Sequence, residues 1–311
     1  MTATSDSDHP NATEAPAAPT LADAVRVIED LYPPHTAEGW DAVGLVAGDP
    51  AAPVHKILFA VDPVETVVDE AVEWGADLIV THHPLLLKPV HSVAATTFKG
   101  SLVHRLVREG IALHVAHTNA DAAPDGVADA LADLLGILDR APLVPSGTDP
   151  EVRGIGRVGR LEQPVTLRVF AEGVAAALPA TAQGVRVAGD PDGTVRTVAV
   201  VGGSGDSLFD DVRAARADVY VTADLRHHPA SELRERAAFE ASDGGSGTPY
   251  LVDVAHFASE WPWLALAARD VVRGLGATPA GATEDQGAGG TVEARVSTRS
   301  TDPWTFRVAP A

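Results

Sequence analysis

Short apolar runs alternate with amphipathic stretches along the chain, and this alternation restricts the possible folds more than any other feature. Buried-strand patterns occupy residues 57–61, 78–81 and 111–115. Helical apolar spacing occupies residues 21–31, 63–74, 102–109 and 126–135. Strands that alternate with helices pair in parallel and are covered by helices on their faces. The pattern therefore predicts a layered α/β fold.

A second alternation follows residues 142–156, whose prolines and glycines are typical of a linker. Its strand patterns lie at residues 167–170, 185–188, 195–201, 219–222 and 250–254, and a helical pattern follows at 257–272. We expect two layered α/β subdomains with mostly parallel or mixed sheets. One comprises residues 21–140 together with 250–311, and residues 141–249 form a second α/β domain inserted into it. Residues 1–20 are expected to be a disordered tail and 280–290 a loose loop.

Two segments of the chain resemble each other. Residues 76–81 (ADLIVT) directly precede a His-His-Pro sequence at 82–84. Residues 217–222 (ADVYVT) precede a second His-His-Pro sequence, at 227–229, by four residues. Duplication of an α/β half would produce this likeness. Chance similarity between two strands rich in alanine and valine would also produce it, and the sequence leaves both explanations open.

Charge and composition exclude several classes of partner. The formal net charge is -20 and the isoelectric point about 4.8. Such a surface repels nucleic-acid phosphates and anionic lipids, and no apolar run is long enough to span a bilayer, so neither nucleic acid nor a membrane is expected as a partner. The N-terminal residues lack the features of a signal peptide and the chain has no cysteine, so a cytoplasmic location is expected. Without thiolates, a transition metal would have to be bound by imidazole and carboxylate groups.

Metal-binding side chains follow three of the expected strands. His82 and His83 come directly after the second strand, and Asp121 follows the third. His256 follows the last strand of the second region, and Glu260 is one helical turn further along. The carboxyl ends of parallel strands meet at one edge of a sheet, so these side chains are expected to converge. Three imidazoles and two carboxylates suit two divalent ions, which could be zinc, iron, manganese, cobalt or nickel.

Each of these residues also has a simpler explanation. The adjacent histidines could be solvated loop residues, and Asp121 could cap a turn. His256 and Glu260 could belong to an ordinary charged helix face. Taken singly, these explanations compete well with metal binding, and it is the combination of all five residues that favours a metal site.

Other polar segments are open to two interpretations. Residues 202–205 (GGSG) resemble a turn that cradles phosphate, but they equally suit a tight turn between a strand and a helix. Asp224, His227 and His228 are candidates for catalytic or substrate-binding groups. In residues 38–41 (EGWD), the acids and the tryptophan either line a pocket or supply a core residue and a cap.

Five motifs occur in an order that resembles one known family. The segments WDAVGL, ADLIVTHHPL, HTNAD, TADLRHH and AHFASE are similar to signatures of the NIF-three-like family of dinuclear-metal proteins, often labelled GTP cyclohydrolase 1 type 2 homologues. The resemblance covers about residues 21–306. The resemblance implies a two-domain α/β subunit and a toroidal homohexamer. It implies the metal ligands His82, His83, Asp121, His256 and Glu260. The chain departs from the family's common Asn, Gly and Gly at Ala42, Ala223 and Ala255.

The resemblance also implies a metal-dependent hydrolase. Two metal ions lower the pKa of a bridging water and polarise the substrate, which gives a nucleophile at neutral pH. If the family label applies, the substrate is GTP, and a metal-bound hydroxide opens the guanine ring at C8. His227 or His228 would then move protons, with Asp224 as a further catalytic candidate, while Arg226 and the metals receive the triphosphate. The alternative is a non-catalytic metal-binding adaptor that uses the hexameric ring as a scaffold.

Overall fold

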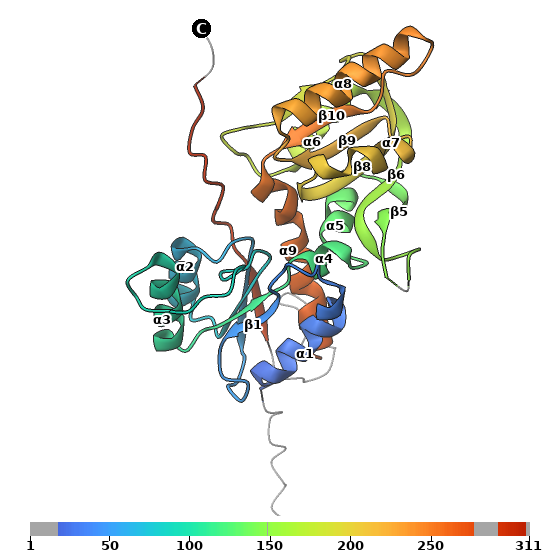
Figure 1. Ribbon diagram of the computed structural model, residues 1–311. Helices are drawn as coiled ribbons and strands as arrows, with labels where there is room; N and C mark the ends of the chain where they lie inside the picture. Colours follow the sequence, from blue (N-terminus) through green and yellow to red (C-terminus); the bar gives the residue numbers. More distant parts are fainter. Residues whose placement is uncertain (1–17, 148, 277–291, 309–311) are drawn as a thin grey trace, which may run out of the picture.

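The computed structural model describes residues 18–147, 149–276 and 292–308 (Figure 1). Within these ranges the chain forms two β-sheets, each covered by helices. The predicted α/β class, with two units built on parallel and mixed sheets, is confirmed. The predictions made for residues 1–17 of the expected 1–20 tail and for residues 280–290 lie outside the described residues. For Thr20 the predicted disorder is wrong, because this residue caps the helix that begins at Leu21 and pairs with Pro53.

The first sheet consists, in the described residues, of five strands in the order β1-β4-β3-β2-β11. Their bounds are Gly44–Ala47 (β1), Lys56–Ala60 (β2), Leu78–Thr81 (β3), Ala112–Val115 (β4) and Glu293–Val296 (β11). Strands β11, β2, β3 and β4 are parallel, whereas β1 is antiparallel to β4. Because β2, β3 and β4 run in the same direction, their carboxyl ends meet at one edge of the sheet.

Helices cover both faces of this sheet. They are α1 (Leu21–Leu31), α2 (Glu65–Trp74), α3 (Phe98–Glu109) and α9 (His256–Gly274). Leu58 of β2 packs in the core with α2 and α3, and its neighbour Phe59 points to the opposite face, in the core with α1 and α9. A strand buried on both faces is apolar at successive positions, which explains the continuous apolar runs in the sequence.

The second sheet consists, in the same ranges, of six strands in the order β5-β6-β8-β9-β10-β7. Their bounds are Leu138–Pro145 (β5), Gly154–Thr166 (β6), Arg186–Ala188 (β7), Thr194–Ser204 (β8), Val219–Ala223 (β9) and Tyr250–Val254 (β10). Strands β8, β9 and β10 are parallel, and the other neighbours are antiparallel. The remaining helices are α4 (Thr118–Ala122), α5 (Val127–Leu134), α6 (Leu167–Ala177), α7 (Phe209–Ala214) and α8 (His227–Ser242), with 3-10 turns η1 (Pro34–Thr36) and η2 (Asp206–Leu208).

Strand β10 lies in the second sheet. The predicted division into 21–140 plus 250–311 and 141–249 groups this strand with the first domain, and for β10 that placement is wrong, because it pairs with β9 and β7. The chain passes from one half to the other between β10 and α9. The apolar pattern of a buried strand carries no information about which sheet it joins. The division into two domains otherwise stays a prediction.

Two local predictions in the second half are also wrong. Residues 167–170 begin helix α6 and do not form a strand, because Thr166 caps the helix and the buried positions recur every three or four residues. Residues 142–156 are not a linker, since they hold the turn end of a hairpin in which Val144 lies opposite Ile155. Short apolar runs and proline or glycine clusters are compatible with more than one structure.

The two halves share one order of elements. The series β2-α2-β3-α3-β4 matches the series β8-α7-β9-α8-β10, and in each the three strands are parallel neighbours. Asp77, just before β3, accepts hydrogen bonds from two successive backbone N–H groups at the start of β2. Asp218, just before β9, does the same for two N–H groups of β8. This is the arrangement expected of duplicated halves, and duplication itself stays a prediction.

Helix α9 joins the two halves (Figure 1). It packs against α5 and β8 as well as against β2, β11 and α1. Trp263 of α9 is fully buried, and its indole N–H donates to the Tyr32 hydroxyl at 3.1 Å. Because α9 begins directly after β10, its first turns lie where the two sheets approach each other.

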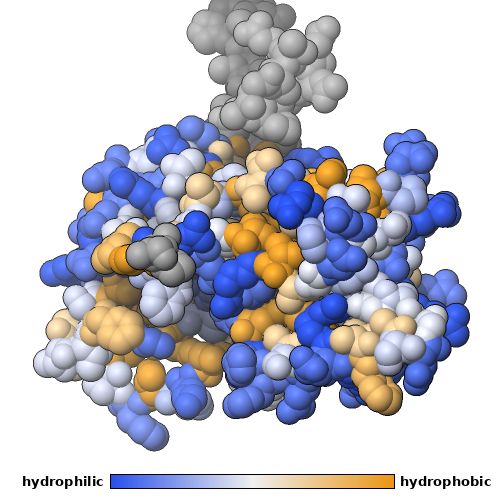
Figure 2. All heavy atoms as spheres, turned by 90° about the horizontal axis from the view of Figure 1, so that it is seen from above, coloured by the Kyte–Doolittle hydropathy of each residue, from blue (hydrophilic) through white to orange (hydrophobic). Residues whose placement is uncertain are grey.

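The face of the molecule that is seen from above is mainly hydrophilic. Viewed from above in Figure 2, apolar side chains gather only in smaller patches between the polar ones. Among the described helices, none combines the length and the apolar character needed to cross a membrane.

Candidate metal centre

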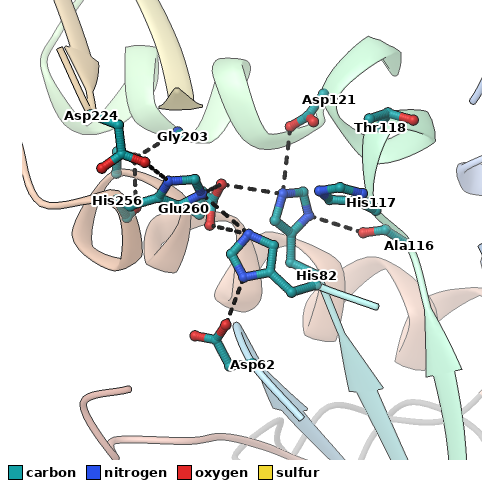
Figure 3. Close-up of polar contacts among 12 residues, drawn as sticks. Asp62, His82, Ala116, His117, Thr118, Asp121, Gly203, Asp224, His256 and Glu260 are labelled. Carbon is teal, nitrogen blue, oxygen red and sulfur yellow. Dashed lines mark hydrogen bonds and ion pairs between the residues drawn. The ribbon is translucent and has the colours of Figure 1, made fainter. Parts of the chain in front are cut away.

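The five predicted ligands come from three segments that meet between the two halves (Figure 3). His82 and His83 follow β3, Asp121 lies on α4, and His256 and Glu260 lie at the start of α9. Glu260 is buried: its Oε1 is 2.9 Å from His256 Nε2 and 3.5 Å from His82 Nε2, and its Oε2 is 3.2 Å from His83 Nε2. Asp121 Oδ1 lies 3.7 Å from His82 Nε2. The structure therefore brings all five side chains together.

A sixth side chain, His117, belongs to the same cluster. Its ring centroid lies 5.1 Å from that of His82 and 5.5 Å from that of His83. Nitrogen atoms of these three rings lie within 4.8 Å of one another, close enough to share a metal ion. The predicted ligand set omits His117, although a signal was present. His117 precedes Asp121 by four residues, the same spacing as the His-Glu pair of α9, and Val-Ala precedes the histidine in both cases.

Every histidine of this cluster has its Nδ1 fixed by an oxygen acceptor. The four hydrogen bonds run from His82 to the Ala116 carbonyl (3.0 Å), from His83 to Asp62 (2.7 Å), from His117 to Asp41 (2.8 Å) and from His256 to Asp224 (2.7 Å). Carbonyl and ionised carboxylate oxygens only accept hydrogen bonds, so each Nδ1 carries a proton and leaves Nε2 as the free ligand atom. In metal sites, such partners orient the imidazole and raise its basicity.

Several polar atoms at the centre lack a partner among the residues that the structure describes. His82 Nε2 and Glu260 Oε2 are buried and make no hydrogen bond. His83 Nε2 and His256 Nε2 are 3.2 Å apart, so two lone pairs face each other unless one ring takes up a second proton. Buried polar atoms in this state are costly. Divalent cations would satisfy all four atoms, and the nitrogen and oxygen donors fit zinc, iron, manganese, cobalt or nickel.

The charges around the centre also favour a cation. Burial alone would lower the pKa values of His83 and His256, but the nearby carboxylates outweigh it and raise the pKa of His83 to about 11 and that of His256 to about 9. Burial would raise the pKa of Glu260, yet the facing histidines hold it well below its ordinary value. At Asp121 burial dominates and raises the pKa to about 6. These shifts favour positive charge on His83 and His256 beside a negative Glu260, so a cation that binds here has to displace protons from the two histidines.

Gly203 allows β8 to approach the cluster closely. A Cβ atom at this position would lie 2.6 Å from Glu260 Oε1 and 3.1 Å from His256 Nε2, and φ is +70°. The Gly203 N–H donates to Ser259 Oγ at 2.8 Å, which fixes the start of α9. Both the space and the backbone conformation therefore require glycine. A phosphate-cradling role for residues 202–205 stays a prediction.

Two cavities border the cluster. The larger, with a volume of about 410 Å³, is lined by Trp40 and by four residues of the cluster, namely His117, Asp121, His256 and Glu260. The smaller, of about 270 Å³, is lined by Trp304 together with His83, His256, Asp62 and Asp224. We call them the Trp40 cavity and the Trp304 cavity. The cluster can thus be reached through two different spaces.

The remaining predicted catalytic residues lie in different places. Asp224 accepts a hydrogen bond from Nδ1–H of His256 and so positions a predicted ligand. His227 and His228 are exposed at the start of α8. His227 lines a third cavity, of about 420 Å³, together with Arg226, and within the described residues neither histidine lines the Trp40 or the Trp304 cavity. Catalytic roles for these residues stay predictions.

Two positioning residues were missed or only half identified from the sequence. Asp62 was not predicted, although it follows the carboxyl end of β2, the kind of position that drew attention to His82. Asp41 was expected to cap a helix or to line a pocket. Its carboxylate accepts the N–H and the hydroxyl of Thr118 at the start of α4, and also Nδ1–H of His117. It therefore caps α4 and positions a histidine at once.

Known proteins resemble this chain over most of its length. The model of the family Duf34/NIF3 (NGG1p interacting factor 3) matches residues 19–278. A Streptomyces coelicolor protein named GTP cyclohydrolase 1 type 2 homolog is 52% identical, over 94% of this chain and 96% of that protein. A Mycobacterium tuberculosis protein of the same name is 36% identical, over 91% of this chain and 96% of its own length. The crystal structure of a Bacillus cereus protein related to NIF3 has a TM-score of 0.77 at 24% identity, covering 94% of this chain and 100% of the other, and so shares the fold. The chain therefore belongs to the Duf34/NIF3 family.

Proposed function

We propose that this protein is a hydrolase that uses two divalent metal ions, with GTP as the first candidate substrate. One observation carries the proposal: His82 Nε2 and Glu260 Oε2 are buried without a partner in the described part of the chain, among histidines whose Nδ1 atoms are already bonded. The name shared by the relatives, GTP cyclohydrolase 1 type 2 homolog, supports the choice of substrate.

The residues that would hold the ions are those implied by the motifs. His82 and Asp121 would serve one ion, and His83 and His256 the other. The buried Glu260 carboxylate lies within 3.5 Å of a histidine Nε2 atom in each pair, so it could contribute to holding both ions. When bound, two such ions lower the pKa of water and polarise the substrate.

The protein itself contributes orientation and enclosure. Asp62 and Asp224 hold His83 and His256 through Nδ1, which keeps both Nε2 atoms directed at the centre. The Trp40 cavity reaches three of the proposed ligands and is large enough for a small molecule. A substrate in this cavity would meet the metal ligands without any movement of the two sheets.

Metal analysis tests the site. We expect about two divalent ions per purified chain, and loss of most of this metal in the double variant His83→Ala, Glu260→Ala. A His35→Ala variant, altered at an exposed histidine of η1, serves as the control and should keep its metal. A parent that binds fewer than about one ion per chain, or a double variant with full metal content, would contradict the assignment.

Turnover of GTP with defined metals tests the reaction. A ring-opened product that depends on added metal and disappears in the double variant would support the hydrolase. Full metal occupancy without turnover would favour the metal-binding adaptor, with which the words "interacting factor" in the family description agree. The toroidal homohexamer also remains a prediction, and the mass of the native particle in solution tests it.

A further inference from the structure

Residues 38–41 form a tight turn that hydrogen bonds hold beside the candidate metal centre. The Asp41 N–H donates to the Glu38 carbonyl at 2.9 Å, which closes the turn. The Asp41 side chain is fully buried, and its carboxylate accepts hydrogen bonds from His117 Nδ1 and from the Thr118 N–H. The Glu38 N–H donates in turn to the Thr118 hydroxyl at 2.9 Å. Both ends of the turn are therefore fixed to the residues that begin α4.

This fixed turn presents a large aromatic side chain to solvent. Trp40 is 59% exposed, and its ring packs edge-on against His117 with the centroids 5.9 Å apart. An exposed tryptophan on a mobile loop would need no explanation, but here the backbone on one side of it is held by a buried carboxylate. Trp40 lines the same cavity as Asp121, His256 and Glu260. A planar molecule stacked on Trp40 would lie directly beside the proposed metal ligands.

The charges of the Trp40 cavity indicate which part of a ligand it accepts. Its acidic lining residues are Glu38, Asp121 and Glu260, and no lysine or arginine lines it within the described part of the chain. Asp121 and Glu260 are proposed metal ligands, so Glu38 is the acid in this lining that stays free when metal is bound. No described side chain of the lining would pair with a polyphosphate, whereas Glu38 would attract a neutral group that donates hydrogen bonds. Glu38 lies at the opposite end of the turn from Asp41, and a free carboxylate can accept two adjacent N–H groups at once.

From this arrangement we infer that the Trp40 cavity binds a neutral, planar heteroaromatic ring with two adjacent N–H donors on one edge, of which guanine is the common biological example. Trp40 stacks on the ring face, and Glu38 accepts the two donors. The volume of about 410 Å³ accommodates such a ring next to His117 and His256. The inference rests on the proposed function only for the choice of guanosine and GTP as the first ligands.

Calorimetric titration of the metal-loaded, full-length protein tests this ring site. We expect guanosine to bind within about threefold of GTP, because the polyphosphate adds little, and adenosine to bind at least about tenfold more weakly. Trp40→Leu should weaken guanosine binding about tenfold or more, as expected for the loss of one stacking partner. Glu38→Gln should weaken guanosine binding and reduce the preference over adenosine. The matched variant Trp304→Leu, altered at an exposed tryptophan of the other cavity, should bind guanosine like the parent.

Several outcomes would overturn the ring site. They are the absence of measurable guanosine binding, binding of GTP that depends on its phosphates, unchanged binding in Trp40→Leu, and a loss confined to Trp304→Leu. Metal content measured in every variant ensures that a weakened centre is not mistaken for a lost ring contact. Guanosine binding that requires Trp40, without GTP turnover, would leave the ring site intact and refute the hydrolase. GTP turnover that is unchanged in Trp40→Leu and Glu38→Gln would support the hydrolase and refute the ring site.

Discussion

His83 is held in place by a relay of two hydrogen bonds. Its Nδ1–H donates to Asp62, and the other carboxylate oxygen of Asp62 accepts the hydroxyl of Thr301. Thr301 lies in the segment that follows β11 and lines the Trp304 cavity. A residue near the end of the described chain thus determines the orientation of a proposed ligand that follows β3.

Replacing Asp62 by Asn should weaken metal binding by about tenfold to a hundredfold, because the acceptor that orients His83 loses its charge. Thr301→Val should weaken metal binding less than Asp62→Asn does. Thr301→Ser, which keeps the hydroxyl, should bind metal with the parental affinity. Competition with a chromophoric chelator measures all three. Asp30→Asn, on the exposed surface of α1, is the control. Equal affinities in the parent and Asp62→Asn would rule out the relay.

Replacing Gly203 by Ala should expel metal from the centre. The added methyl group would lie 2.6 Å from Glu260 Oε1, and the φ of +70° disfavours alanine. We expect the metal content to fall to about half or less of the parental value, since Glu260 serves both proposed ions. Gly173→Ala on α6 is the matched control, since no atom of the described residues lies within 4 Å of the added Cβ. Full metal occupancy in Gly203→Ala would show that the centre tolerates a shift of β8.

His114 makes stability depend on pH. Its ring is buried on β4, neither nitrogen has a hydrogen-bond partner in the described part of the chain, and the nearest acid, Glu29, is 3.9 Å away. Burial lowers the pKa of His114 from 6.5 to about 4. Between these two values the unfolded chain binds a proton that the folded chain does not. The free energy of unfolding should therefore fall as the pH drops through this window.

The loss attributable to His114 amounts to about 3 kcal/mol at most. His114→Leu should remove this contribution, so that stability declines less between pH 6.5 and 4. Urea unfolding at a series of pH values provides the comparison, with the exposed His35→Leu as control. Parallel pH profiles for the parent and His114→Leu would refute the assignment.

At the scale of elements, one buried arginine connects β6 to the helices beside the candidate metal centre. Arg157 is 3% exposed, and its Nε donates to Asp129 of α5 at 2.9 Å. The same guanidinium donates to the carbonyls of Gly154, Gly156 and Ala123 at 2.8–2.9 Å. Because α4 and α5 follow β4, this single side chain connects the second sheet to the segment that carries Asp121.

Replacing Arg157 by Leu should lower the free energy of unfolding by about 3–5 kcal/mol, because it removes the buried cationic partner of Asp129 and the donor to three carbonyls. Arg157→Lys should recover only part of this, since an ammonium group cannot reproduce the planar fork. Urea denaturation measures both. Arg160→Leu, on the same strand but exposed, should change stability by less than about 0.5–1 kcal/mol. Similar losses in the two leucine variants would argue against the network.

The elements differ in how well their sequence predicted them. Strands β2, β3 and β4 were identified because burial on both faces leaves continuous apolar runs. Residues 167–170 were not, since four apolar-rich residues fit a strand as well as a helix start, and only the cap at Thr166 decides. The hairpin around residues 142–156 was hidden by its prolines and glycines, and it is fixed partly by tertiary contacts such as those of Arg157.

The site was predictable to the extent that its residues follow local rules. His82, Asp121 and Glu260 could be found from strand ends and helical spacing, and the motifs then grouped them. The contact between Asp62 and Thr301 joins positions 239 residues apart, and no local sequence pattern predicts it. Side chains that position a ligand through a second residue depend on the finished tertiary structure.

At the scale of the whole molecule, the proposed ligands bridge the two halves. His82 and His83 follow a strand of the first sheet, whereas His256 follows β10 of the second sheet and begins the helix that returns to the first. A metal held by both groups therefore links the halves. Such a metal binds the folded state and not the unfolded chain, so it stabilises the whole arrangement.

Removing metal should accordingly lower the melting temperature. At a free metal concentration of about one hundred times Kd, binding adds about 2.7 kcal/mol to the free energy of unfolding, and a chelator should abolish this gain. Glu260→Ala should melt at the same temperature with and without metal. Calorimetry on both proteins provides the measurement. If the chelator leaves the melting temperature of the parent protein unchanged, the two halves are held together without metal.

The separation of the proposed ligands along the chain has a consequence for when the protein could bind metal during synthesis. His83 and His256 are 173 positions apart, and their Nε2 atoms meet only once both sheets and α9 are in place. A nascent chain that has exposed His82 and His83 but not yet α9 therefore has half of the candidate centre, with no Glu260 to complete it. The proposed ions would therefore be captured after translation, by a folded protein whose finished geometry would determine which ion it retains.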